Sequence, residues 1–252
     1  AWNASASLHS RGAEWDSLLE QAARPDFSVL DPELRETIRA LGLEGKSAAQ
    51  VGCNNARELL SLASLKVIPS VGIDQSGAFL EQGRVLAKAA GLEPRLIEAD
   101  IYDLPDDVGT FDLVLVTIGV LNWMPDLGGF FRVIAGLLGP GGHLLVYETH
   151  PVMEMFDPES DTPHEPAISY FRTDPLKEEG LISYDGVDHG SGETGYWFIH
   201  TLGQIVTSCA TAGMTITSLK EFGYSIREPE YDVYEGREAQ IPMSYLLHAR
   251  KM

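Results

Sequence analysis

The sequence predicts an α/β fold in which a mostly parallel sheet is covered by helices on both faces. From about Ala48 onward, short strand-like runs alternate with helix-like runs, as expected for right-handed crossovers in a doubly wound sheet. Residues 112–118 are almost continuously apolar, which indicates a strand buried on both faces. A small-residue turn at 50–56 is followed by Asp74 at the end of the next strand. That pairing is typical of a nucleotide-binding crevice in an open sheet.

The hydrophobic periodicity places the individual elements. Residues 1–42 have the loose amphipathic pattern of a helical cap. Helices are expected over 56–65, 79–91, 125–138 and 201–213, the last with a capping box formed by Thr201 and Gln204. Strands are expected at 48–51, 67–73, 95–99, 112–118, 143–147, 215–219 and 244–249. These are seven strands in a single domain that spans residues 1–252.

The segment 151–195 interrupts the alternation. It contains five prolines, several glycines and many acids, and a loop of this length inside a compact domain usually has a function or is disordered. Residues 168–171 and 181–184 alternate like short strands. We interpret the segment as an insertion that folds over a pocket, after a core at 48–150 and before a final helix and strands at 196–252.

Composition limits the classes of partner and the compartment. The net charge is −19, from 37 acids and 18 bases, and such a surface repels phosphate backbones, so nucleic acid is not an expected partner. Cys53 and Cys209 are the only cysteines, which argues against a disulfide framework. The sequence has no signal-peptide pattern and no apolar run of membrane-spanning length. We therefore expect a cytoplasmic protein without a membrane partner, and a homodimer stays open.

The order of these motifs resembles the class I S-adenosylmethionine-dependent methyltransferases, in their small-molecule branch. The resemblance rests on the turn at 50–56, Asp74, the block 98–101, and the stretch from Phe111 through Asn122 and Trp123 to the glycines at 139–142. It implies a Rossmann-like methyltransferase sandwich with seven strands. It also implies S-adenosylmethionine as cofactor, its demethylated product S-adenosylhomocysteine, and a small-molecule methyl acceptor, for which secondary metabolism is a compatible setting.

The resemblance also implies roles for particular residues. The turn formed by Gly52, Cys53, Asn54 and Asn55 would lie under the methionine part of the cofactor. Asp74, with Gln75 beside it, would accept hydrogen bonds from the ribose hydroxyls, because carboxylates are strong acceptors. Asp100 would accept from the adenine amino group, and Ile101 would lie against the ring. The residues expected near the methionine amino group and the transferred methyl are Thr117, Ile118 and Gly119.

Three positions depart from the family pattern. The family usually has an acid where Gln50 stands, and glycines where Asn54 and Ala56 stand. Asparagine tolerates positive φ, so the geometry of the turn can survive. Loss of the acid removes one partner for the methionine end of the cofactor, unless the Gln50 amide replaces it.

Catalytic and acceptor-binding candidates follow the fifth strand and the fourth strand. Methyl transfer relies largely on proximity, with a base where the acceptor must lose a proton. His150, just after the fifth strand, is the first candidate base and His200 is the second; a structural role is an equal alternative for each. The substrate-binding candidates are Asn122, Trp123, Tyr170 and Trp197, together with Tyr184 and Tyr224, for which ordinary core packing is the alternative. Glu148 and Glu193 are interpreted as solvated acids rather than substrate ligands.

Alternative functions remain. One is an enzyme that uses S-adenosylmethionine for a different reaction, and another is a non-catalytic protein that binds it. A nicotinamide-dependent oxidoreductase is disfavoured because the glycine spacing of dinucleotide-binding turns is absent. No metal site is predicted, since the seven histidines are scattered along the chain.

Overall fold

A seven-stranded sheet forms the centre of the molecule. The structure is a computed structural model that describes residues 2–181, 190 and 192–252. The strands lie in the order β3-β2-β1-β4-β5-β9-β8, with β9 antiparallel to both of its neighbours and the other pairs parallel. Their bounds are β1 Ser47–Val51, β2 Ile68–Asp74, β3 Arg95–Glu98, β4 Phe111–Thr117, β5 Leu138–Thr149, β8 Met214–Phe222 and β9 Ser244–Lys251. The predicted seven-stranded, mostly parallel sheet is confirmed.

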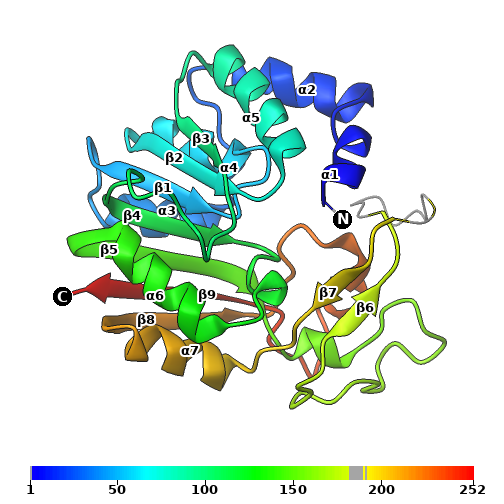
Figure 1. Ribbon diagram of the computed structural model, residues 1–252. Coiled ribbons are helices and arrows are strands. Elements are labelled where there is room, and N and C mark those ends of the chain that lie inside the picture. Colours follow the sequence, from blue (N-terminus) through cyan, green and yellow to red (C-terminus); the bar gives the residue numbers. More distant parts are fainter. Residues whose placement is uncertain (1, 182–189, 191) are drawn as a thin grey trace.

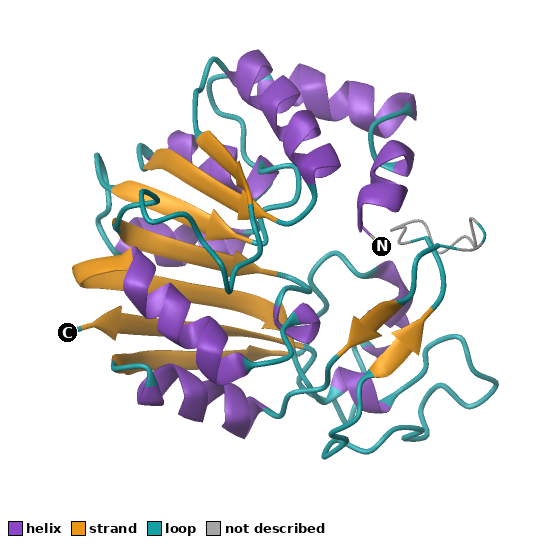
Figure 2. Ribbon diagram, viewed as in Figure 1, coloured by secondary structure: helices purple, strands orange, loops and turns teal. Residues whose placement is uncertain are grey.

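Helices cover both faces of the sheet, as expected (Figures 1 and 2). One face packs against α3 (Pro32–Ala40), α4 (Arg57–Ser61) with its 3-10 extension η2 (Leu62–Leu65), and the start of α5 (Gly77–Ala90). The other face packs against α6 (Leu127–Leu137) and α7 (Leu202–Thr211). The continuous apolar run of β4 is fully buried between these layers, since Leu113, Val114, Leu115 and Val116 are each 0% exposed. The α7 capping box between Thr201 and Gln204 is also present.

The boundary between α6 and β5 differs from the prediction. α6 begins at Leu127, with the Asp126 side chain accepting from the Gly129 N–H as its N-cap, rather than at Pro125. β5 then begins at Leu138 instead of residue 143, so the glycine-rich stretch 139–142 lies inside the strand. Its pairing with β4 is irregular between Phe111 and Leu113. The strand leaves no room for a side chain at Gly142, because a Cβ atom would lie 2.9 Å from the Gly139 carbonyl oxygen.

The N-terminal residues are helical, as predicted, but they do not form one cap. The segment comprises α1 (Trp2–Ser5), the 3-10 turn η1 (Ala6–Leu8) and α2 (Gly12–Ala22) before α3. α2 packs against α5 through Ala22, Leu86 and Ala87. α3 instead belongs to the layer on the sheet, where Leu34 and Ile38 are buried. α1 lies on the side of the sheet where the parallel strands end (Figure 1).

The insertion contains a small two-stranded ribbon at positions that the sequence does not predict. β6 (Leu176–Glu178) pairs antiparallel with β7 (Gly195–Trp197). The strand expected at 168–171 is wrong: the Ser169 hydroxyl accepts from the Phe171 N–H and the Ser169 carbonyl accepts from Arg172, which closes a turn instead. Phe171 is 77% exposed. Of the strand expected at 181–184, residues 182–184 lie outside the described residues.

A second connection, between β8 and β9, packs against the insertion. It carries the 3-10 helix η5 (Pro229–Tyr234), and the insertion begins with η4 (Met153–Met155). Met153, Tyr234 and Met243 form a separate buried cluster between the two. The Tyr234 hydroxyl also donates to the Pro163 carbonyl at 2.8 Å. The structure beyond the carboxyl end of β5 is therefore built from two segments, of which the sequence identifies only the first.

No helix within the described ranges is both long and apolar enough to cross a membrane.

Candidate functional site

The turn after β1 is tied to the end of β2. The Asn54 N–H donates to Asp74 Oδ2 at 2.7 Å, and the Ser76 N–H donates to Asp74 Oδ1 at 2.8 Å. Burial raises the pKa of Asp74, although these N–H donors act in the opposite direction. Each carboxylate oxygen has two lone pairs, so Asp74 can accept further hydrogen bonds from a ligand. Gln75, next to it, is exposed.

The backbone of this turn is left-handed at three positions. φ is +64° at Gly52, +50° at Asn54 and +59° at Ala56. At Gly52 a Cβ atom would lie 2.4 Å from the Val120 side chain, so only glycine fits there. The turn thus has a glycine-like backbone at the two positions where the family pattern has glycine and this chain has Asn54 and Ala56. Asn55 and Cys53 are buried beneath it.

The Gln50 side chain lies in the protein interior and is hydrogen-bonded there. Its side chain is buried; Nε2 donates to Thr117 Oγ1 at 3.0 Å, and Oε1 accepts from the Leu59 N–H at 2.9 Å. The amide therefore links β1 to the end of β4 and to α4. One N–H of the amide remains for a ligand, whereas the acid of the family pattern would offer a negative charge.

The residues after β3 lie at the same edge of the sheet. Asp100 is exposed, and its Oδ1 accepts from the Tyr102 N–H at 2.9 Å. Ile101 is 7% exposed and belongs to the main hydrophobic cluster. Its packing in the core is compatible with only a small contact with a ligand.

Glu148 organises the loop that follows β4. This side chain, at the end of β5, is 2% exposed, so the interpretation of a solvated acid is wrong for it. Its carboxylate accepts from the N–H groups of Gly119, Val120 at 2.9 Å and Leu121 at 3.1 Å. Burial raises the pKa of Glu148 to about 8, against the lowering effect of these donors. The loop containing Ile118 and Gly119 is thereby fixed beside the Gly52 turn, where Val120 contacts Gly52. Glu193, the other acid of that pair, is exposed.

Three of the predicted substrate-binding residues are neighbours in the structure: Asn122, Trp123 and Trp197. Asn122 Nδ2 donates to Glu154 Oε1 at 3.2 Å and to the Phe198 carbonyl at 3.0 Å. Trp197 Nε1 donates to Glu154 Oε2 at 2.8 Å, and the Trp197 ring stands edge-on to Trp123 with centroids 5.4 Å apart. Glu154 in η4 is the shared acceptor. No local pattern in the sequence indicates this role, because its partners are far apart along the chain.

The remaining tyrosine candidates lie elsewhere. Tyr170 is half-buried, and its hydroxyl accepts from the Leu202 N–H at 3.0 Å, at the start of α7. Tyr184 lies outside the described residues. Tyr224 belongs to a different place, a pocket on the α3 side of the sheet.

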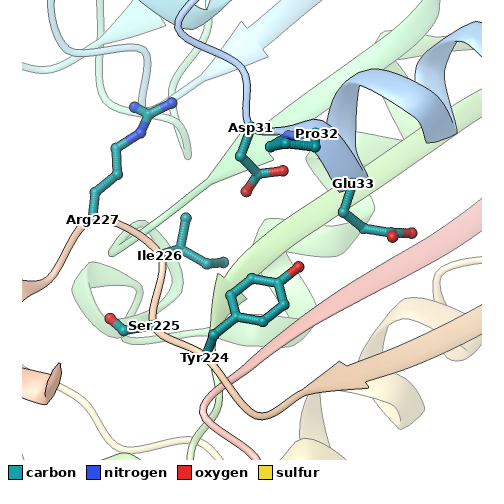
Figure 3. Close-up of a pocket in the computed structure, with 7 residues that line it drawn as sticks. All are labelled: Asp31, Pro32, Glu33, Tyr224, Ser225, Ile226 and Arg227. Atoms are coloured by element: carbon teal, nitrogen blue, oxygen red, sulfur yellow. The ribbon is translucent and has the colours of Figure 1, made fainter. Parts of the chain in front are cut away.

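That pocket has a volume of about 440 Å³ and is lined by the start of α3 and the chain after β8 (Figure 3). Its polar side chains are already paired with the protein. Asp31 accepts from the Leu34 N–H, Glu33 binds Lys220, and Arg227 binds Glu58 and the Val29 carbonyl. Of the predicted site residues that the structure describes, Tyr224 alone lines it. We therefore interpret this pocket as a gap where two chain segments pack together, rather than as a ligand site.

The two histidine candidates are held differently. His150 is 5% exposed, Nδ1 accepts from the Val152 N–H at 3.1 Å, and Nε2 lies 3.0 Å from Glu221 Oε1. Both of its ring nitrogens are therefore engaged. His200 Nε2 donates to the Met124 carbonyl at 2.8 Å, which assigns the lone pair to Nδ1. Burial lowers the pKa of both, so each is neutral at pH 7. The catalytic role of either remains a prediction.

Within the part of the chain that the structure describes, no three His, Cys, Asp or Glu side chains gather in a way that could hold a metal ion.

The site is thus a line of loops along the carboxyl ends of β1, β2, β3, β4 and β5, which is where ligands bind in open α/β sheets. A family model described as a methyltransferase domain matches residues 49–146. Residues 49–146 are therefore similar to a methyltransferase domain, and the fold of the chain is that of the class I S-adenosylmethionine-dependent methyltransferases.

Particular relatives agree with this assignment. A demethylmenaquinone methyltransferase of Thermus thermophilus is 40% identical over 84 residues, which are 32% of this chain and 36% of that protein. The enzyme of the same name from Staphylococcus epidermidis is 31% identical over 117 residues, 45% of this chain and 47% of that protein. The chain thus spans less than half the length of these curated relatives.

Solved structures share the fold over most of the chain. An S-adenosylmethionine-dependent methyltransferase from Mesorhizobium loti superposes with a TM-score of 0.58 at 18% identity, covering 95% of this chain and 98% of that one. A glycopeptide N-methyltransferase solved with S-adenosylmethionine gives a TM-score of 0.53 at 14% identity, covering 87% and 93%. Identities this low show the fold alone.

Proposed function

We propose that this protein transfers a methyl group from S-adenosylmethionine to a small-molecule acceptor in the cytoplasm. The observation that carries the proposal is the Asp74 carboxylate, held by the Asn54 and Ser76 N–H groups between the turn after β1 and the end of β2. This is the position from which an acid reaches the ribose hydroxyls of a nucleotide. The net charge of −19 supports a small acceptor rather than nucleic acid. For the assembly, we propose a homodimer, which light scattering can test.

The residues present fit the cofactor. Asp74 keeps lone pairs for two ribose hydroxyls, and the exposed carboxylate of Asp100 can accept from the adenine amino group. The left-handed backbone at Gly52 and Asn54 keeps side chains out of the turn, so a ligand can approach it closely. Bound S-adenosylmethionine would supply a methyl group on a sulfonium sulfur for transfer to the acceptor, with S-adenosylhomocysteine as the leaving group.

On the acceptor side, we propose that Asn122, Trp123 and Trp197 position the substrate, with Tyr170 at its margin. The Glu154 contacts fix the orientations of the Asn122 amide and the Trp197 indole before a ligand arrives. Where the acceptor must lose a proton, His200 is the better placed base, because its neutral ring keeps a lone pair on Nδ1. His150 has both nitrogens engaged and would need to break a contact first.

The test is calorimetric titration of the native chain with S-adenosylmethionine, S-adenosylhomocysteine and NAD. We expect both sulfur nucleotides to bind in the micromolar range and NAD not to bind. Asp74→Ala should abolish binding. Asp74→Asn keeps one acceptor oxygen and the shape of the side chain, and should weaken binding by about tenfold, the loss of one charge-assisted hydrogen bond.

Asp103→Ala is the matched control, because Asp103 is an exposed acid in the loop after β3. It should bind as the native chain does. Binding of NAD alone would favour an oxidoreductase. Binding of the sulfur nucleotides without methylation in a broad acceptor screen would favour a non-catalytic binding protein or a different reaction. If neither sulfur nucleotide binds, the proposed function is wrong.

A further inference from the structure

The loop between β3 and β4 begins with a tight turn around Asp100. The Asp103 N–H donates to the Asp100 carbonyl at 2.9 Å, and the Tyr102 N–H donates to Asp100 Oδ1 at 2.9 Å. Ile101, between them, is 7% exposed and packs in the main hydrophobic cluster. One carboxylate oxygen of the exposed Asp100 side chain is therefore held by its own loop, which leaves Oδ2 for a ligand.

The Tyr102 side chain ties this turn to the start of α6. Its hydroxyl donates to the Asp126 carbonyl at 3.0 Å and accepts from the Asp126 N–H at 3.2 Å. Asp126 is itself the N-cap of α6, since its side chain accepts from the Gly129 N–H at 2.9 Å. The tyrosine ring lies close to Gly129, where a Cβ atom would stand 3.2 Å from Tyr102 Cε1. The hydroxyl therefore makes two hydrogen bonds to one residue at the capped end of a helix that packs on the sheet.

A second attachment holds the other end of the same loop. Arg95 Nη1 donates to the Asp107 carbonyl at 2.9 Å, and Nη2 donates to the Asp107 carboxylate at 2.9 Å. Both residues are exposed. Tyr102 is next to the Asp100 turn, whereas the Arg95 contact lies nearer to β4, so the two attachments can be removed separately.

We propose that Tyr102 is a positioning residue for the nucleotide base, which acts by holding the Asp100 carboxylate where it accepts from the adenine amino group. The inference rests on the proposed function, which assigns Asp100 to that amino group. An exposed carboxylate on a loose loop has to be ordered when a ligand binds, and that ordering weakens the hydrogen bond it makes. The anchored turn is ordered beforehand. The Tyr102 hydroxyl thus contributes to the selection of adenine through Asp100, rather than by contact with the base.

Calorimetric titration with S-adenosylhomocysteine and with S-inosylhomocysteine tests this proposal. The second nucleotide carries an oxygen in place of the adenine amino group, so the native chain should bind it about tenfold more weakly, by the loss of a hydrogen bond to a charged acceptor. Tyr102→Phe removes only the hydroxyl. It should reduce this ratio about fivefold, through weaker binding of S-adenosylhomocysteine, and change the affinity for S-inosylhomocysteine by less than about twofold. Arg95→Gln releases the other end of the loop and is the matched control, which should keep the native ratio.

A double-mutant cycle shows whether the hydroxyl acts through Asp100. Asp100→Ala should itself reduce the preference for S-adenosylhomocysteine, and Tyr102→Phe added to it should change the affinity for neither nucleotide further. Additive effects of the two substitutions would overturn the positioning role.

The remaining outcomes separate this role from the proposed function. Equal weakening of both nucleotides in Tyr102→Phe would show that the hydroxyl is only structural, and an equal loss of the ratio in Arg95→Gln would show that any loosening of the loop suffices. Either result overturns the role of Tyr102, as does equal affinity of the native chain for the two nucleotides, and all three leave the proposed function standing. Absence of S-adenosylhomocysteine binding to the native chain would overturn both.

Discussion

Glu148, at the end of β5, accepts a hydrogen bond from the backbone N–H of Gly119 in the loop after β4. The same carboxylate also accepts from Val120 and Leu121. A single buried side chain therefore satisfies three successive N–H groups that the strand and the following 3-10 turn leave unpaired. This loop is the one proposed to face the methyl group, so its conformation depends on a residue from the neighbouring strand.

Substitution of Glu148 should loosen this loop. Glu148→Ala leaves three buried N–H groups without an acceptor, and we expect the free energy of unfolding to fall by about 3 kcal/mol. Glu148→Gln keeps one oxygen for Val120 and Leu121, so the loss should be about half as large. Urea unfolding at pH 7 measures both. Glu93→Ala, which removes an exposed acid before β3, is the control; equal stability of Glu148→Ala and the native chain would contradict the assigned role.

Arg227 should stabilise the chain through the buried Glu58. Burial by itself raises the pKa of Glu58, but the charges of Arg57 and Arg227, with the Arg227 hydrogen bond, lower it to about 2. Removal of one partner of a buried pair is costly, and Arg57 remains, so Arg227→Ala should lose about 3 kcal/mol at pH 7. Arg227 also has a φ of +59°, so the native contacts hold it in a strained conformation.

The pH dependence of this effect has a defined sign. A carboxylate with a lowered folded pKa contributes stability that is present above its unfolded pKa of about 4.5 and is lost as the pH falls toward about 2. The difference between native and Arg227→Ala should therefore shrink below pH 4.5. Lys220→Ala, which breaks the exposed pair with Glu33, should cost less than about 0.5 kcal/mol. A difference that does not change between pH 7 and pH 3 would argue against the Glu58 pairing.

His143 and His248 should make the sheet sensitive to mild acid. Their Nδ1 and Nε2 atoms lie 2.8 Å apart on β5 and β9, so at most one of the two can hold the proton between them. Burial, His143 and Arg250 lower the pKa of His248 to about 4; burial and Arg250 also lower the pKa of His143, although Asp112 opposes this. A base with a lowered folded pKa favours the unfolded state as the pH falls below 6.5.

The stability that the pair contributes should therefore decline from pH 6.5 toward pH 4. His248→Gln keeps a hydrogen-bonding side chain that does not titrate. We expect the native chain to lose more stability than His248→Gln between pH 7.5 and pH 5, in chemical denaturation at both pH values. Parallel losses in the two proteins would refute the role of the pair.

Gln50→Glu should restore the charge that the family pattern places in the turn. Leu59 can still donate to the new carboxylate, and the Thr117 hydroxyl can rotate to donate as well. We expect S-adenosylmethionine to bind about fivefold tighter, because the carboxylate attracts its two positive charges, with a smaller gain for S-adenosylhomocysteine. The buried charge should lower the stability of the free protein. Calorimetry of both nucleotides measures the effect, and weaker binding of S-adenosylmethionine would contradict the expected attraction.

The sequence by itself determined the layered sheet. Strand and helix periods, the apolar run of β4 and the capping box of α7 are local patterns, and each can be read within a short window of residues. The same windows placed Asp74 and the Gly52 turn at one edge, because parallel strands all end there. The comparisons support this part, since the matched family model covers residues 49–146.

Only the tertiary structure decided what surrounds that edge. The pairing of Glu148 with Gly119, of Glu154 with Trp197 and of Trp2 with Trp123 joins residues that are 29, 43 and 121 positions apart along the chain. Such contacts leave no local period, because each depends on where two distant segments pack. The sequence predicted the short strands of the insertion at 168–171 and 181–184 rather than at β6 and β7 for the same reason. The pairing of β6 with β7 joins distant residues, whereas the residues around Ser169 form a local turn.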